Sequence, residues 1–110
     1  MYEYEIKIDR VVDGDTVDGW IELGFNISTK KRIRLYGINA PESRTTDLAE
    51  KAKGLESKAW LVERLEGKTV TVKTEKDSSG KYGRTLGTLF IDSVNINTEM
   101  IAKGLAQEYT

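Results

Sequence analysis

Apolar and polar residues alternate in five separate segments, and one helical segment interrupts them. This order limits the folds open to the chain more than any other feature of the sequence. In the first segment Tyr4, Ile6, Ile8 and Val12 lie on one face at period two, which is typical of a strand that buries that face. The Asp13-Gly14-Asp15 run then marks a turn. The predicted strands cover residues 2–12, 16–23, 31–38, 68–74 and 84–92.

The periodicity changes to that of a helix between the third and fourth predicted strands. Apolar residues recur there at helical spacing, which predicts a helix over residues 54–66 that ends at Gly67. Residues 46–53 are charged, and they form either a flexible loop or a short helical lead-in. The apolar helical positions are Leu55, Ala59, Val62 and Leu65.

A second, shorter helix is expected from an N-cap at Asn97 to about Lys103, closed by Gly104. The predicted order is therefore β-β-β-α-β-β-α. Five strands with a helix between the third and fourth form the connectivity of a five-stranded OB-fold barrel, a mainly β (α+β) fold with two packed helices. An open α+β sheet is the alternative. At 110 residues, we expect the whole of 1–110 to be a single domain.

The composition restricts the chemistry. The chain has no cysteine and no histidine, which removes thiolate chemistry, thiolate metal sites, the most common general base and imidazole metal ligands. Hard cations with oxygen ligands, such as calcium or magnesium, remain. The formal charge is −1, so contact with nucleic acid must come from a local basic patch or a bound cation.

The same composition bears on location. No apolar run approaches the roughly 18 residues that cross a bilayer, so we expect no membrane partner. Residues 1–12 alternate between charged and apolar types, unlike a signal peptide. Three possibilities stay open: a cytoplasmic protein, a phage-encoded protein, or a secreted protein whose leader has been removed. We expect a monomer.

Acidic and basic residues that can act on phosphate stand in three short clusters. Asp15 follows a glycine turn, so its carboxylate is either a metal ligand at the end of a strand or ordinary turn chemistry. Asp13 is the better candidate for capping the turn. Arg34 lies on the strand face opposite Ile33 and Leu35, within a basic run that could also be a solvated edge.

The second cluster continues into a loop stiffened by Pro41, the only proline of the chain. Such a loop can hold Asn39 and Glu42 in fixed directions. A carboxylate at Glu42 can orient or deprotonate a water molecule, or cap the next segment. Asn39 stands where a phosphodiester-cleaving site would be expected to carry an acid.

The third cluster is Lys81-Tyr82-Gly83-Arg84, at the start of the fifth predicted strand. A guanidinium offers a planar fork that binds two phosphate oxygens, and Arg34 with Arg84 would supply two of them. Tyr82 can stack on a base or bond to a phosphate. The plainer interpretation is a turn with an extended lysine and a half-buried tyrosine.

Taken together, these clusters resemble the staphylococcal-nuclease-like (thermonuclease) family. Several motifs in one order at compatible spacings are far more specific than any one of them. They extend along most of the chain. The matching segments are residues 12–17, 34–42, 81–84 and 97–106.

The resemblance implies an OB-fold barrel that acts as a calcium-dependent nuclease on DNA and RNA and leaves 3′-phosphorylated products. It implies a calcium site made by Asp15, position 39 and the backbone carbonyl of Ala40. It also implies phosphate binding by Arg34 and Arg84. It further implies that Glu42 orients or deprotonates the attacking water, and that Lys81 and Tyr82 contact the nucleotide.

The sequence departs from the family pattern at a few positions. Asn39 replaces the second acid; an amide oxygen can ligate calcium but brings no negative charge, so weaker metal affinity is expected. Gly80 replaces a frequent aspartate. Tyr109 is about one residue out of register with a family tyrosine. The chain also ends before the third helix found in longer family members.

Two other functions stay open. One is an OB-fold module that binds nucleic acid or a peptide without cutting it. The other is a structural or assembly protein that uses Trp20 and Trp60 as packing anchors, although both tryptophans are more simply core or groove-wall residues.

Overall fold

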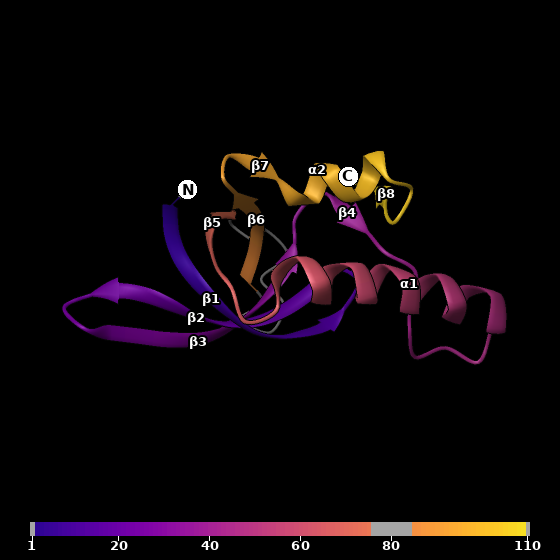
Figure 1. Cartoon of the computed structure of the whole chain (residues 1–110), viewed down its shortest axis with the longest axis horizontal. Coiled ribbons are helices and arrows are strands. Elements are labelled where there is room, and N and C mark those ends of the chain that lie inside the picture. The colour runs from indigo at the N-terminus through magenta and orange to yellow at the C-terminus, as the bar shows by residue number, and fades with distance from the viewer. Residues whose placement is uncertain (1, 76–84, 110) are drawn as a thin grey trace.

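The computed structural model describes residues 2–75 and 85–109. Within them, a strongly bent sheet forms a barrel, with helices packed against it (Figure 1). The long strands are β1 (Tyr2–Asp13), β2 (Thr16–Gly24), β3 (Ile27–Leu35), β5 (Thr69–Glu75) and β6 (Thr85–Ile91). The helices are α1 (Leu48–Leu65) and α2 (Ile96–Ala102), and the short strands are β4 (Ile38–Asn39), β7 (Val94–Asn95) and β8 (Gln107–Glu108).

Pairing between β3 and β6 closes the barrel. β1 pairs antiparallel with β2 and β5, β2 pairs with β3, and β5 pairs with β6. The ends of this ladder then meet in parallel register, with Ile33 opposite Thr85 and Leu35 opposite Gly87. The prediction of a closed five-stranded OB-fold barrel is therefore confirmed, and the open sheet is wrong.

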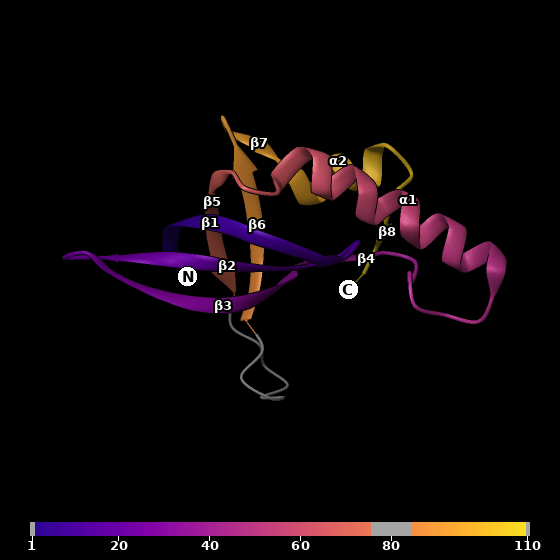
Figure 2. The same ribbon diagram turned by 60° about the horizontal axis from the view of Figure 1, so that its bottom comes forward.

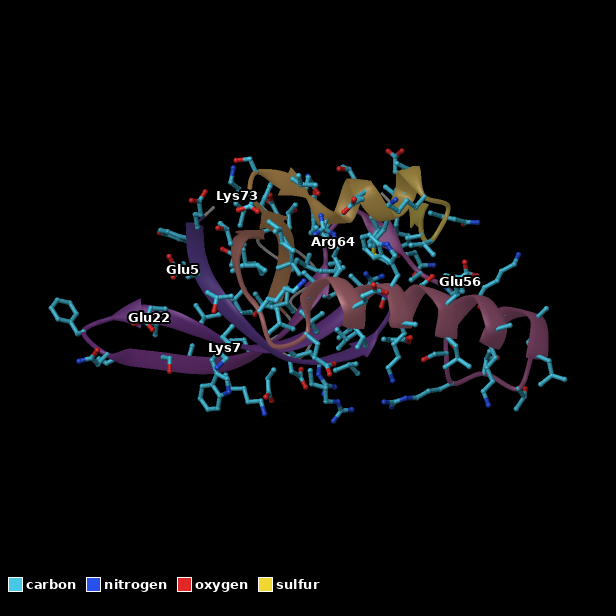
Figure 3. The ribbon with its side chains drawn as sticks, viewed as in Figure 1. Glu5, Lys7, Glu22, Glu56, Arg64 and Lys73 are labelled. Carbon is cyan, nitrogen blue, oxygen red and sulfur yellow. The ribbon has the colours of Figure 1, made fainter. Side chains whose placement is uncertain are left out.

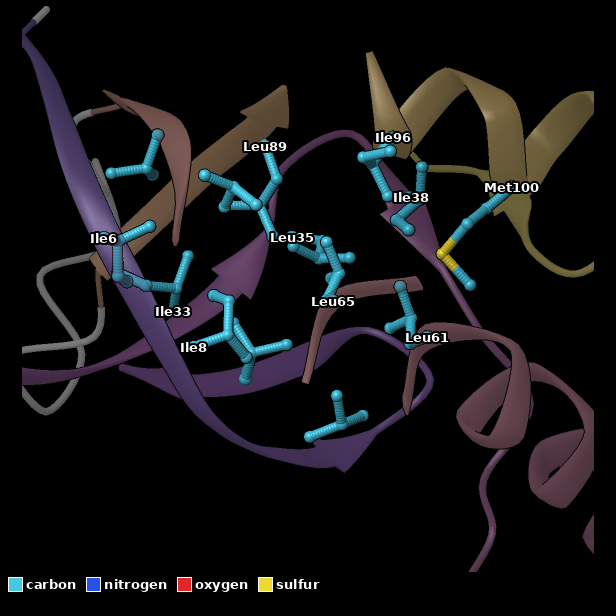
Figure 4. Packing of buried hydrophobic residues seen from close by; sticks show 14 of the residues in the cluster. Ile6, Ile8, Ile33, Leu35, Ile38, Leu61, Leu65, Leu89, Ile96 and Met100 are labelled. Carbon is cyan, nitrogen blue, oxygen red and sulfur yellow. The ribbon is translucent and has the colours of Figure 1, made fainter. Parts of the chain in front are cut away.

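The alternating apolar residues fill the barrel, as the strand patterns predicted. Ile6, Ile8, Ile33 and Leu89 point inward from the three strands β1, β3 and β6 and are fully buried (Figure 4). Leu61 and Leu65 of α1 close one end of this core, while Ile96 and Met100 of α2 pack with Ile38 beside it. No helix in the described ranges is both long and apolar enough to cross a membrane.

The β2–β3 hairpin extends well beyond the barrel. Figures 1 and 2 show that it projects from one side, while the first half of α1 projects from the other. Its turn uses left-handed backbone at Phe25 (φ 55°) and Asn26 (φ 60°), and Phe25 is 96% exposed. This paired positive φ is the geometry that two-residue hairpin turns need.

Helix α1 begins earlier than the sequence predicted. It starts at Leu48, because Asp47 caps it by accepting hydrogen bonds from the backbone N–H groups of Ala49 and Glu50. The predicted end at Gly67 is confirmed by its left-handed φ of 77°. The predicted apolar face is wrong in part, because Leu55 and Ala59 are exposed. The helix instead packs through a face that includes the small residues Gly54 and Ser57. The buried positions are Gly54, Ser57, Leu61 and Leu65.

Helix α2 is capped by Asn95, not by Asn97 as the sequence predicted. The Asn95 side chain accepts a hydrogen bond from the N–H of Thr98. Asn97 is buried instead, and its amide accepts from the N–H of Leu89 and donates to the carbonyls of Tyr36 and Gly87. It thereby joins α2 to β6 and to the turn after β3.

These two asparagines give a matched test. Asn97→Asp replaces a buried NH2 donor by an acceptor facing two carbonyls, so we expect the free energy of unfolding to fall by at least about 2 kcal/mol. Asn95→Asp keeps a good N-cap and should change it by less than about 0.5 kcal/mol. Urea unfolding of both variants measures the difference. Equal stability of the two would contradict the buried role of Asn97.

Candidate active site

Arg34 lies near the end of β3, on the outward face that the alternation predicted. Its Nη1 donates to the carbonyl oxygens of Leu35 and Ile38, each at 2.9 Å. Only 19% of its side chain is exposed. The turn between β3 and β4 therefore holds the guanidinium in one orientation on the barrel rim.

Asp15 lies in the turn directly before β2 and reaches the same rim. One carboxylate oxygen accepts from the hydroxyl of Thr16 at 3.1 Å, and the other accepts from the N–H of Ala40 at 3.0 Å. The second oxygen also lies 3.5 Å from Nη2 of Arg34. Asp15 thus ties the start of β2 to the loop after β4.

Asn39 joins this cluster from β4. Its amide oxygen accepts a hydrogen bond from Nη2 of Arg34 at 3.3 Å. Because one nitrogen of Arg34 contacts both Asp15 and Asn39, two oxygens far apart in sequence lie close together. The structure brings Asp15, Arg34, Asn39 and Ala40 into one place.

The Asp15 carboxylate and the Asn39 amide supply oxygen ligands, the kind of ligand that a hard cation prefers. The cluster is poor in negative charge, however. Within residues 2–75 and 85–109, no group of three or more acidic residues is arranged to hold a metal ion. Asp13 does not add to the site, since its carboxylate accepts from the N–H of Gly14 and the hydroxyl of Ser43. This agrees with the turn-capping role predicted for Asp13.

Glu42 is exposed, and its backbone is fixed by close packing against α1. A Cβ added at Gly54 would overlap the carbonyl of Glu42 and the N–H of Ser43. Ser43 is buried and hydrogen-bonds to Asp13 at 2.8 Å. The loop is therefore held from both sides while the Glu42 side chain stays open to solvent.

Sequence reasoning missed the part that small residues play in this arrangement. A Cβ at Gly14 would lie 2.9 Å from the Cβ atoms of Ala40 and Ser57, so the turn, the loop and α1 meet without space between them. The Ser57 hydroxyl also donates to the carbonyl of Leu105 at 2.6 Å. A glycine inside a helical pattern, as at Gly54, is the signal that could have found this contact.

The described residues do not include every predicted site residue. Lys81, Tyr82 and Arg84 are outside the described residues. The described residues resume at Thr85. Leu86 pairs with Arg34, so β6 begins beside the cluster. Tyr109 donates its N–H to the carbonyl of Gly37 at 2.9 Å, and its residue is 62% exposed.

The fold is thus a closed OB barrel whose rim carries a fixed arginine in contact with oxygens of Asp15 and Asn39. The chain belongs to the staphylococcal nuclease family. The family model "Staphylococcal nuclease homologue" matches residues 32–110.

Curated relatives agree with this assignment. The chain is 34% identical to "Endonuclease YhcR" of Bacillus subtilis (strain 168) over 97% of its own length and 9% of that protein's. It is 36% identical to "Probable staphylococcal-like nuclease CAN1" of Oryza sativa subsp. japonica over 76% of this chain and 23% of that one. The "Thermonuclease" of Staphylococcus hyicus is 26% identical over 96% of this chain and 59% of that one. The chain thus spans only part of the length of each.

Packing at Gly54 makes a stability prediction. At an open helix position, Gly→Ala stabilises by about 1 kcal/mol. Here we expect Gly54→Ala to lower the free energy of unfolding by about 1–3 kcal/mol, because the added methyl must displace the Glu42 backbone. Lys53→Ala, at the adjacent exposed position, should stay within about 0.5 kcal/mol of the parent. A more stable Gly54→Ala variant in urea unfolding would show that the close contact with Glu42 is absent.

Proposed function

We propose that this chain hydrolyses phosphodiester bonds in DNA and RNA. The observation that carries the proposal is the contact of one Arg34 nitrogen with oxygens of both Asp15 and Asn39. It brings a guanidinium, a group suited to binding phosphate, together with oxygens of the kind that hard cations prefer, on a nuclease-family barrel. Membership of that family, and the names of the relatives, support the same conclusion.

Arg34 would stabilise the negative charge that builds up on the phosphate oxygens. Leu35 and Ile38 hold Nη1, so the guanidinium needs no reorientation when substrate arrives. Such preorganised donors act most strongly in the transition state, where the charge is largest. Arg84 is proposed as the second guanidinium, with Lys81 and Tyr82 on the nucleotide, from the family resemblance.

Asp15, Asn39 and the carbonyl of Ala40 are the residues proposed to hold a calcium ion. When bound, calcium would offset charge on the non-bridging phosphate oxygens. The contacts of Asp15 and Asn39 with Arg34 support this proposal, because both oxygens lie beside the guanidinium that is proposed to bind phosphate. With one carboxylate among the three ligands, we expect modest calcium affinity.

Glu42 is proposed to orient or deprotonate the attacking water. Its fixed backbone and exposed side chain suit a group that must reach a water within about 3 Å. Water adds to phosphorus, the bond from phosphorus to O5′ breaks, and O5′ leaves with a proton. The products are a 3′-phosphate and a 5′-hydroxyl.

Substrate preference follows from which part of the nucleic acid is bound. Contacts with backbone phosphate carry little sequence information, so we expect slight sequence preference. Unpaired strands should be favoured, because OB-type surfaces bind bases that are splayed out and stacked on aromatic side chains. We expect the protein to act as a monomer.

A second candidate is a module that binds nucleic acid or a peptide without cutting it. The neutral Asn39 favours this alternative, since it leaves the proposed cation site with a single carboxylate. Cleavage itself separates the two functions.

The decisive experiment is digestion of denatured DNA with calcium and, in parallel, with chelator. We expect cleavage only with calcium, faster than on duplex DNA. Arg34→Ala, and likewise Arg84→Ala, should lower kcat by roughly two or more orders of magnitude. Arg64→Ala is the control and should leave kcat unchanged, because Arg64, which Figure 3 labels, pairs with Glu99 between the two helices. Absence of calcium-dependent cleavage at high protein concentration would favour the binding module.

Asn39→Asp tests the calcium ligands directly. The variant adds a negative charge beside Asp15, so we expect tighter calcium binding in a calorimetric titration. Asn26→Asp adds the same charge at the tip of the β2–β3 hairpin and should leave the titration unchanged. An identical calcium affinity for Asn39→Asp and the parent would remove Asn39 from the ligand set.

A further inference from the structure

The outer face of β1, β2 and β3 carries a set of side chains that the proposed reaction does not use. The strand register places them in rows across the sheet: Lys7 lies opposite Trp20 and Trp20 opposite Lys30, while Arg10 and Arg32 flank Asp18 in the next row. A further row pairs Thr16 with Arg34 at the candidate active site. We call the first five basic and aromatic residues the outer strip; they are Lys7, Arg10, Trp20, Lys30 and Arg32.

Trp20 is not needed for the barrel core. Its neighbours Gly19 and Ile21 face inward and are buried, whereas Trp20 faces outward and is 45% exposed. The ammonium nitrogen of Lys30 lies 5.8 Å from the centre of its ring. Of the two positions expected for Trp20, core or groove wall, the core is therefore wrong. An exposed indole flanked by two lysines has the chemistry of a surface that stacks bases and neutralises phosphates.

The strip is locally basic on a chain whose formal charge is −1. Its four cations outnumber two nearby acids, and each acid orients one of them. Asp9 lies 3.2 Å from the Lys30 nitrogen. Asp18 accepts two hydrogen bonds from Arg32, at 2.8 and 3.1 Å.

Asp18 holds the Arg32 guanidinium in one orientation but occupies only some of its N–H donors. The hydrogen bond from Arg32 lowers the pKa of the Asp18 carboxyl. An arginine has five N–H donors, so those not bonded to Asp18 can bind another anion. The Arg32 side chain is 61% exposed, which leaves it accessible to one.

The strip is continuous with the candidate active site. A hollow of about 310 Å³ beside the site has both Arg32 and Arg34 in its wall, together with Arg44 from the loop that carries Glu42. From Arg34 to Lys30 along β3 is about 13 Å, at the usual rise per residue of a strand. At the far end the strip stops at the acidic Glu5 and Glu22, which Figure 3 labels near Lys7.

We propose that the outer strip binds the single strand of nucleic acid that continues from the scissile phosphate, with a base stacked on Trp20 and phosphates on the surrounding lysines and arginines. The proposal rests on the proposed function for its ligand. The sites that OB folds offer to single strands cover about 4–16 nucleotides. The strip would therefore add affinity for long substrates only.

The test measures binding of labelled oligothymidylates of about three and about twelve nucleotides, by fluorescence anisotropy in chelator so that no cleavage occurs. We expect Trp20→Ala to weaken binding of the long oligonucleotide about fivefold or more. The double variant Lys7→Glu/Lys30→Glu should weaken it further and reduce its salt dependence. Neither change should alter binding of the short one.

Matched controls come from the same chain. Phe25→Ala removes an exposed aromatic from the tip of the same hairpin, and Lys51→Glu/Lys103→Glu makes the same charge change on exposed positions away from the strip. Both should bind like the parent. Urea unfolding of every variant shows whether the fold is retained.

The outcomes separate this proposal from the proposed function. Parent-like binding of the long oligonucleotide by folded Trp20→Ala and Lys7→Glu/Lys30→Glu overturns the strip, and so does an equal loss for both lengths. If the parent never cleaves DNA with calcium but the strip variants lose binding, the strip stands and the nuclease proposal fails.

Discussion

The parallel pairing of β3 with β6 is the interaction on which the rest of the structure depends. It turns a curved sheet into a closed barrel, and it brings the strand that carries Arg34 next to the strand that follows residues 81–84. Parallel neighbours need a long connection between them, and here that connection includes α1 and β5. The candidate site is therefore located where β3 and β6, the outermost long strands of the sheet, meet.

Close packing of small residues connects this arrangement to the loop that carries Glu42. Gly14, Ala40 and Ser57 meet at the point where the β1–β2 turn, the loop after β4 and α1 touch. Gly54 lets α1 lie directly on the backbone of Glu42. A side chain at either glycine would push the loop away from Arg34. The geometry of the site therefore depends on the absence of a Cβ atom at Gly14 and Gly54.

Asn39 illustrates a balance between two requirements of the site. Its neutral oxygen contacts Arg34, where an aspartate would form a second ion pair with the same guanidinium. A neutral residue therefore competes less with a phosphate for Arg34, but it contributes less to binding a divalent cation. In the proposed site, Asn39 would thus leave phosphate binding by Arg34 strong and cation binding weak.

The sequence by itself determined the strands, the outward direction of Arg34 and the class of chemistry, because period-two alternation and residue type are local properties. It also carried the order of elements that an OB barrel requires. It did not show that Asn97 is a buried linker, that α1 begins at Leu48, or that Gly54 supports Glu42. Only the tertiary structure decided these, along with the convergence of Asp15, Asn39 and Arg34. Each depends on contacts between residues distant in the chain, which no local periodicity records.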